Sequence, residues 1–262
     1  MEGEDHKSSL SLFLRNAVRR TGYSCERTTP HHPLTHLVLD HPVLTVNTTH
    51  QVHLVHVTPE AEELIAYMAR VSNPANQQNT KTSAKLIKYL IEHKHWSPFE
   101  MVNMCVSIET NRGIAAQLLR HRSFSFQEFS QRYARVEQLP SVPELRRQDE
   151  KNRQNSVDDL DPVLVNTLQY DLMKHYGETY RLYQRMLDLG VAKECAREVL
   201  PMATPTKLYM NGTLRSWLHY CDLRTSNGTQ KEHAQIAAQI QDLLCLHFPN
   251  VCEAMWNKNL DY

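Results

Sequence analysis

The residues best suited to chemistry lie in one segment near the middle of the chain, 120–133, which reads Arg-His-Arg-Ser-Phe-Ser-Phe-Gln-Glu-Phe-Ser-Gln-Arg-Tyr. It opens with three side chains that are or can become cationic, and phenylalanines then alternate with serines and a glutamate. Guanidinium groups bind phosphate oxygens through two parallel hydrogen bonds and also stack on planar rings. The segment therefore predicts a pocket for a phosphorylated ligand with flat rings. From the residues alone, the alternative is a basic helix end that faces solvent or a phosphate backbone.

The same segment resembles the Arg-His-Arg-x-x-Ser-x-x-x-x-Ser-x-Arg motif of the flavin-dependent thymidylate synthases. Every specified position of the motif is matched, by Arg120, His121, Arg122, Ser125, Ser130 and Arg132. Similarity to further blocks of the family covers residues 54–248 of this chain. The chain departs from the family pattern at Gln127, where asparagine is frequent, and at Met101 and Gly228, where histidine is frequent.

The resemblance implies a set of side chains that hold the flavin cofactor, FAD. Ser72 ends an Ala-Arg-Val-Ser block and Ser97 stands in a His-x-His-x-Ser-Pro-Phe-Glu block, both similar to family blocks. The implied flavin contacts are Ser72, Ser97, Arg120, His121, Arg122, Glu128, Thr213, Leu214, Arg215 and His219. Taken alone, Arg215 and His219 would form an ordinary polar helix face.

The resemblance also implies dUMP as the substrate. The residues that match family positions around the nucleotide are Gln117, Leu118, Leu119, Arg120, Glu128, Phe129, Ser130, Gln131, Arg132, Arg197 and Arg224. Ser130 and Arg132 are expected near the phosphate. Arg197, beside two glutamates, would by itself be a helix-surface arginine with a weak ion pair, and only the order of the blocks makes it a phosphate ligand.

Arg224 is the predicted catalytic residue. The implied reaction is the reductive methylation of dUMP to dTMP, in which carbon 5 of uracil acts as a nucleophile. A guanidinium held against the pyrimidine edge would stabilise the electron-rich ring by fixed electrostatics. The other class of thymidylate synthases uses a cysteine in a Pro-Cys-His context, which none of the six cysteines here has. The implied co-substrates are methylenetetrahydrofolate as carbon donor and NADPH as reductant through FAD, and the implied assembly is a homotetramer with shared active sites.

The composition argues against nucleic acid and membranes as binding partners. Lys+Arg and Asp+Glu both number 29, so the chain lacks the broad positive field that collects nucleic acid. No apolar run is long enough to cross a bilayer. The six scattered cysteines are typical of a reducing compartment, so we expect a cytoplasmic protein without a nucleic-acid or membrane partner. Seven histidines between His31 and His56 follow no recognised ligand spacing, and no metal site is predicted.

Two other classes of function stay open at this point. A nucleotide- or flavin-binding protein that has lost turnover would keep the pocket, and Gly228 is its main support. An RNA- or DNA-binding module would use the arginines and phenylalanines as a stacking platform.

Local patterns predict the elements that must position these residues. The expected strands cover residues 52–57, 99–109 and 207–210, and the expected helices cover residues 58–71, 81–93, 111–119, 161–189, 191–200, 213–223 and 230–247. In the second strand Val102, Met104, Val106 and Ile108 form one apolar face. Thr58 and Asn111 are the expected N-caps of the first and third helices, and Gly190 is expected to end the fourth.

The resemblance implies an α+β fold, an antiparallel sheet packed with several helices in one domain. We expect that domain to cover residues 51–262. Residues 1–50 are interpreted as an N-terminal extension, whose composition leaves open whether it is ordered. Residues 137–161 are polar and interpreted as a long surface excursion, part of it helical or mobile.

Overall fold

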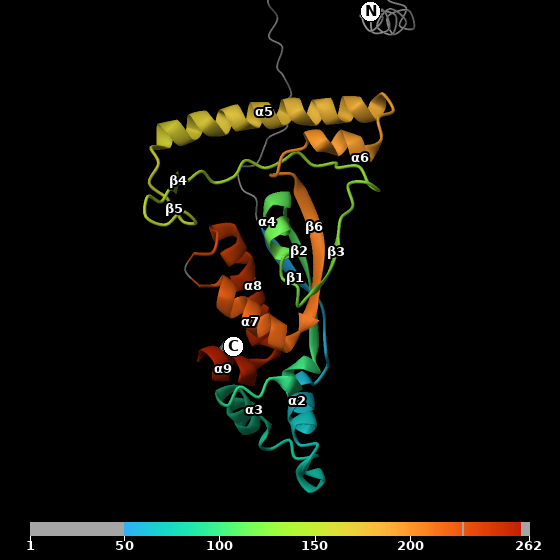
Figure 1. Cartoon of the computed structure of the whole chain (residues 1–262), viewed down its shortest axis with the longest axis vertical. Coiled ribbons are helices and arrows are strands. Elements are labelled where there is room, and N and C mark those ends of the chain that lie inside the picture. The colour runs from blue at the N-terminus through green and yellow to red at the C-terminus, as the bar shows by residue number, and fades with distance from the viewer. Residues whose placement is uncertain (1–49, 227, 258–262) are drawn as a thin grey trace, which may run out of the picture. The chain divides into compact units, whose positions relative to one another are not determined.

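A four-stranded antiparallel sheet organises the computed structural model, which describes residues 50–226 and 228–257. Its strands are β1 (Gln51–Val57), β2 (Asn103–Asn111), β6 (Pro205–Thr213) and β3 (Ser125–Glu128), and they lie in that order across the sheet (Figure 1). β1 pairs directly with β2, whereas β6 lies between β2 and β3, which therefore do not pair with each other. The predicted α+β class with an antiparallel sheet is confirmed.

The central pair of strands, β2 and β6, aligns over its full length, from Asn103 opposite Thr213 to Asn111 opposite Pro205. Side chains alternate between the two faces of a strand. Met104, Val106 and Ile108 are fully buried, as the alternation predicts. The strand begins later than predicted, because residues Ser97–Glu100 form a 3-10 turn that includes Pro98.

Helices cover one face of this sheet and bury the core. They are α4 (Arg112–Leu118), α7 (Leu214–Arg224) and α8 (Lys231–His247). Trp217 of α7 is fully buried, and its Nε1 donates a hydrogen bond of 3.0 Å to the carbonyl of Met104 in β2. The cap predicted at Asn111 is confirmed, since its side chain accepts from the amide of Ile114 at 2.9 Å.

A second group of helices continues this core. It consists of α2 (Ala61–Ala69), α3 (Ser83–Glu92) and α9 (Pro249–Trp256), in which α3 packs on both α2 and α9. The cap predicted at Thr58 is wrong. Its hydroxyl instead accepts from the amide of Asn103 at 2.9 Å, and the helix starts only after Glu60, which has a positive φ of 47°. The sequence analysis did not predict α9 or β3.

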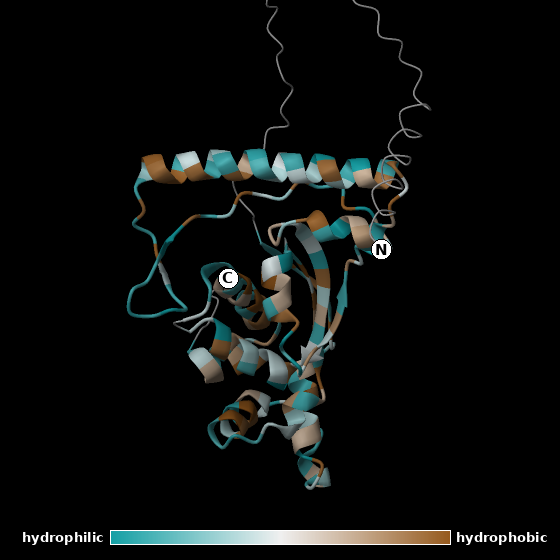
Figure 2. Ribbon diagram, turned by 45° about the horizontal axis from the view of Figure 1, so that its top comes forward, coloured by the Kyte–Doolittle hydropathy of each residue, from teal (hydrophilic) through white to brown (hydrophobic). Residues whose placement is uncertain are grey.

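The longest helix, α5 (Pro162–Asp188), begins and ends as predicted. Asp161 accepts from the amides of Val163 and Leu164 at 2.9 and 3.0 Å, and Gly190 follows the helix with a φ of 86°. Tyr176 and Tyr183 are its buried residues. Figure 2 shows apolar residues interspersed among polar ones along the helix. After it come α6 (Lys193–Ala196) and the 3-10 turn Arg197–Val199.

The excursion of residues 137–161 contains a small β-hairpin and no helix. Its strands are β4 (Arg147–Gln148) and β5 (Ser156–Val157). All described residues belong to one compact unit. The interpretation of residues 1–49 as an extension lies outside the described residues. Of the histidine-rich stretch, His50, His53 and His56 are described, and no group of metal-binding side chains occurs among the described residues.

Candidate active site

The predicted catalytic residue Arg224 meets the family motif at the C-terminal ends of α4 and α7. Its Nε donates a hydrogen bond of 3.0 Å to Nε2 of His121, which is 103 residues away in the chain. The ring of His121 lies edge-on to Tyr220 with 4.9 Å between ring centroids. The fold therefore joins two residues that the sequence assigned to one site from separate blocks.

Gln117 enters the same group of side chains through a histidine of α8. Its Oε1 lies 3.3 Å from Nδ1 of His233, and Nε2 of His233 lies 3.1 Å from the hydroxyl of Tyr220. The rings of His121 and His233 have centroids 6.0 Å apart. We refer to Gln117, His121, Tyr220, Arg224 and His233 as the inner cluster.

His233 and Tyr220 were missed by the sequence analysis. The family pattern has a histidine where this chain has Gly228, and His233 lies five residues later, in the first turn of α8. The spacing carried a signal, since His233 shares a helical face with the buried residues Ile236, Ala237 and Ile240. A histidine on an otherwise apolar face needs a buried hydrogen-bond partner, and the partner here is the inner cluster.

Burial and the charge of Arg224 keep both histidines of the inner cluster neutral. Desolvation, then the charge of Arg224 and then that of His219 lower the pKa of His121 to about 4. Desolvation, Arg224 and His121 lower the pKa of His233 to about 4. Burial raises the pKa of Tyr220. At neutral pH the guanidinium of Arg224 is thus the charged group of the inner cluster, and a neutral His121 accepts its N–H.

Glu128 is placed differently, at the end of β3 next to β6. It accepts from Nη1 of Arg112 at 2.6 Å and from the hydroxyl of Thr206 at 3.0 Å. Arg112 was not predicted as a site residue. Its positive charge offsets the carboxylate of Glu128, which the sequence analysis expected among the flavin and nucleotide contacts, so the two side chains form a neutral pair.

Most residues after β3 are exposed, but Gln131 is buried, with 7% of its surface exposed. Arg132 pairs with Glu194 at 3.0 Å and Arg197 with Glu198 at 3.6 Å, and the four side chains are between one-third and three-quarters exposed. Ion pairs this exposed contribute little. We refer to Phe129, Ser130, Gln131, Arg132 and Arg197 as the outer arm. No hydrogen bond or ion pair between described residues joins it to the inner cluster.

The remaining predicted residues divide into exposed and buried ones. Arg120 and Arg122 are exposed and have no ion pair with any described residue, whereas Arg215 pairs with Glu100. Leu118 and Leu214 are fully buried in the core, so only their backbone can reach a ligand. The other members are exposed or half-buried: Ser72, Ser97, Leu119, Thr213 and His219.

Two cavities lie near these residues. One of about 320 Å³ is lined by Ser97, Pro98 and Met101 together with Tyr67, Met68, Val71 and Gln77. It adjoins the block that ends at Ser72, so two distant flavin candidates lie by one apolar cleft. A second cavity of about 590 Å³ lies against β2 and β6, and Phe129 is the predicted residue that lines it.

Comparisons with known proteins show which sequences this chain is similar to. Residues 53–250 match the sequence model of the family described as thymidylate synthase complementing protein. The chain is 53% identical over 195 residues to the "Probable flavin-dependent thymidylate synthase" of Paramecium bursaria Chlorella virus 1, covering 74% of this chain and 90% of that protein. It is 48% identical over 194 residues to the flavin-dependent thymidylate synthase of Synechocystis sp., covering 74% and 89%.

A solved structure shares the fold. The UMP/dUMP methylase PolB from Streptomyces cacaoi, bound with 5-Br dUMP, superposes with a TM-score of 0.71 at 28% sequence identity. The match covers 79% of this chain and 95% of PolB.

Proposed function

Since the chain belongs to the family of flavin-dependent thymidylate synthases, we propose that it converts dUMP to dTMP with bound FAD. Methylenetetrahydrofolate is the proposed carbon donor and NADPH the proposed reductant. The observation that carries the proposal is the Arg224–His121 hydrogen bond within the inner cluster. It joins the predicted catalytic arginine to the motif by which the flavin site was predicted.

Arg224 is suited to stabilise charge on a pyrimidine. His121 accepts from its Nε, and the two Nη groups have no hydrogen-bond partner among the described residues. A planar guanidinium held on one edge keeps its remaining donors aimed in a fixed direction. Donors fixed before the reaction stabilise developing charge without reorganising. Arg224 would therefore hold the uracil ring in the electron-rich form whose carbon 5 attacks the one-carbon unit.

The residues at the end of α4 fit a flavin dinucleotide. Arg120 and Arg122 are exposed and lack a carboxylate partner among the described residues, so they are available for phosphate oxygens. Ser97 adds a hydroxyl at the rim of the apolar 320 Å³ cleft. When bound, the flavin supplies the hydride and relay chemistry, while these side chains bind and orient it.

The outer arm supports the proposed homotetramer. Ser130 and Arg132 are exposed in the single chain, and the arm shares no described contact with the inner cluster. The long helix α5 also leaves Val163, Leu164, Leu168 and Tyr170 exposed. We infer that the outer arm of one copy completes the nucleotide site of another. Such an assembly would bury both features.

The cytoplasm is the proposed compartment. The scattered cysteines of the sequence support it, because such a pattern is typical of reducing surroundings. Among the described residues, no helix is long and apolar enough to cross a membrane.

The proposal is tested by absorbance spectroscopy of the purified protein. A spectrum is recorded first, and NADPH is then added with dUMP present and air excluded. Visible flavin bands that bleach on reduction, together with tritium release from dUMP labelled at carbon 5, are the expected result. Flavin or dUMP binding without tritium release would instead favour a binding protein. A colourless protein that cannot be reconstituted with FAD, and binds oligonucleotides with steep salt dependence, would favour the nucleic-acid module.

A further inference from the structure

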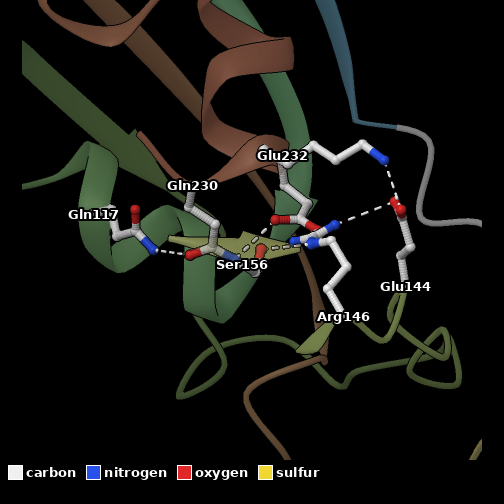
Figure 3. A network of polar contacts seen from close by, with 7 residues as sticks. Gln117, Glu144, Arg146, Ser156, Gln230 and Glu232 are labelled. Carbon is white, nitrogen blue, oxygen red and sulfur yellow. Dashed lines mark hydrogen bonds and ion pairs between the residues drawn. The ribbon is translucent and has the colours of Figure 1, made fainter. Parts of the chain in front are cut away.

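A continuous chain of polar contacts links the inner cluster to Arg146, which lies outside every block used to predict the site (Figure 3). Nη2 of Arg146 donates to Oε1 of Glu232 at 2.7 Å, and Oε2 of Glu232 accepts from Nε2 of Gln230 at 2.9 Å. Oε1 of Gln230 then accepts from Nε2 of Gln117 at 2.6 Å. From Gln117 the contacts continue through His233 to Tyr220. The polar segment 137–161, which contains the β-hairpin, is thereby connected to the C-terminal end of α4.

The direction of every hydrogen bond in this series of polar contacts is set by Glu232, the carboxylate near its start. A carboxylate can only accept, so Glu232 requires the NH₂ group of Gln230 to point toward it. The carbonyl oxygen of Gln230 then faces Gln117, which must present its own NH₂ group. The carbonyl oxygen of Gln117 consequently faces Nδ1 of His233.

The same logic fixes the tautomer of His233. Because Nδ1 faces a carbonyl oxygen, it carries the proton, and Nε2 accepts from the hydroxyl of Tyr220. The side chains hold the protonation states that this arrangement needs at neutral pH. Desolvation alone would raise the pKa of Glu232, but hydrogen bonds from Arg146, its own backbone and Gln230 together lower it. The pKa of His233 is about 4, and burial raises that of Tyr220.

Arg146 is itself held on three sides, unlike an ordinary surface arginine. Its side chain is only 10% exposed, and that of Glu232 is 16% exposed. Nη1 of Arg146 lies 3.2 Å from Glu144, and its Nε donates to Ser156 at 2.9 Å. Lys231 binds the same Glu144 at 2.6 Å. The segment of residues 137–161 is thus ion-paired with the first turn of α8 twice, at Lys231 and at Glu232.

We propose that Arg146 and Glu232 are positioning residues for the dUMP site, which fix the amide of Gln117 in one orientation and His233 in one tautomer. Gln117 then presents a constant pattern of donor and acceptor to the nucleotide. Without this anchor, both glutamines can rotate by half a turn about their last bond and exchange oxygen for nitrogen. The inference rests on the proposed function for the identity of the ligand. The ordering of the polar chain depends on the structure alone.

Affinity for dUMP separates this role from simple stabilisation. Arg146→Ala should weaken dUMP binding by about tenfold in calorimetry of the full-length protein, since one ordered hydrogen bond is at stake. Arg147→Ala is the matched control, because Arg147 is the neighbouring residue but pairs with Asp159 inside the hairpin segment. Its dUMP affinity should stay within about twofold of the wild type. Arg146→Lys should restore most of the affinity, since a single ammonium can still reach Glu232.

Equal dUMP affinities for the Arg146→Ala and Arg147→Ala proteins would overturn the proposal. So would a loss of affinity in Arg146→Ala that Arg146→Lys does not recover, if both variants melt at the wild-type temperature. If the wild type binds neither flavin nor dUMP, the proposed function fails instead. The order of the hydrogen bonds from Arg146 to Tyr220 can then still be tested through the tautomer of His233.

The tautomer of His233 can be read by nitrogen NMR of histidine-labelled protein, with its signals assigned by comparison with His233→Gln. The expected wild-type form carries the proton on Nδ1. Glu232→Gln puts an NH₂ group where only an acceptor stood, so the glutamines are free to reverse and His233 should populate the other tautomer. Wild-type protein with the proton on Nε2, or an unchanged tautomer in Glu232→Gln, would refute the ordering of the chain.

Discussion

In the inner cluster every side chain has a hydrogen-bond partner within the same chain, whereas in the outer arm the charged side chains have only exposed partners. Arg224 binds His121, and His233 joins Gln117 to Tyr220. Arg132, by contrast, forms an ion pair with Glu194, and both side chains are more than half exposed. Both regions contain positions of one sequence motif, yet among the described residues only the first is held by hydrogen bonds between its own members.

The difference teaches that the motif serves two structural roles. Its first half follows α4, where His121 contacts α7 and α8 while Arg120 and Arg122 are exposed. Its second half follows the edge strand β3, where the chain leaves the core. We therefore expect substitutions in the inner cluster to affect reaction rate, packing and, through Gln117, substrate affinity, and those in the outer arm to affect substrate affinity alone.

The largest effect is expected for Arg224→Lys. A lysine keeps the charge but has no planar fork, so it cannot bind His121 and a pyrimidine edge together. Turnover should fall by roughly a hundredfold or more, as when a fixed donor is removed from a transition state. Flavin binding should persist, measured as the visible absorbance of the purified variant. Turnover near the wild-type value would remove Arg224 from the central role.

Packing beneath the inner cluster is tested by Gly212→Ala. A Cβ at Gly212 would lie 2.4 Å from Cδ1 of Phe124, whose ring packs on Trp217 at 4.5 Å between centroids. We expect a loss of about 1–3 kcal/mol in the free energy of unfolding, since a tightly packed core resists added volume. Urea denaturation measures it.

Gly177→Ala is the matched control on α5, where an added Cβ meets nothing within 4 Å. It should stabilise the protein by roughly 0.5–1 kcal/mol, because alanine is the better helix former. A destabilised Gly177→Ala protein would show that another copy packs closely on α5 at this point. If Gly212→Ala and Gly177→Ala change the free energy of unfolding equally, the packing around Gly212 is no tighter than that around Gly177.

The neutral histidines of the inner cluster predict a pH dependence of stability. Histidine has an ordinary pKa of 6.5, and His121 and His233 have values of about 4 in the folded chain. Between these values the unfolded chain binds more protons, so the free energy of unfolding should fall as the pH is lowered from 6.5 toward 4. Denaturation midpoints at successive pH values measure this slope.

His233→Gln is the variant that isolates one of these groups. It removes a titrating ring but keeps a side chain that can hydrogen-bond to Gln117. The fall in stability between pH 6.5 and 4 should become shallower than in the wild type. An identical slope in both proteins would show that His233 takes up protons equally in the folded and the unfolded chain, so that burial does not lower its pKa.

The smallest effect is expected for Ser130→Ala in the outer arm. Loss of one exposed hydroxyl should weaken dUMP binding several-fold, about the worth of one hydrogen bond, while turnover at saturating dUMP stays near the wild-type rate. Steady-state kinetics separate the two. Ser141→Ala removes a hydroxyl outside both regions and should change neither. A complete loss of turnover with dUMP binding intact would assign Ser130 to the chemistry instead.

The sequence by itself determined the local features of this protein. The alternation of Val102, Met104, Val106 and Ile108 placed the central strand, and Asn111, Asp161 and Gly190 marked helix ends. Such signals depend on neighbours a few residues apart, and they survive in any tertiary context that buries the same face. The motif likewise predicts Arg120, His121 and Arg122 as flavin contacts from their types and spacing, and this stays a prediction.

Tertiary structure alone decided which of these residues meet. No local pattern shows that Glu128 pairs with Arg112, or that His233 and not a residue at position 228 completes the inner cluster. The strand β3 is only four residues long and pairs with β6 alone, an edge that lies about 80 residues further along the chain. Thr58 was misassigned for the same reason, since a strand backbone 45 residues away competes for its hydroxyl. Contacts between residues this far apart in the sequence depend on how the helices pack on the sheet. The spacing of residues in a local motif does not predict that packing.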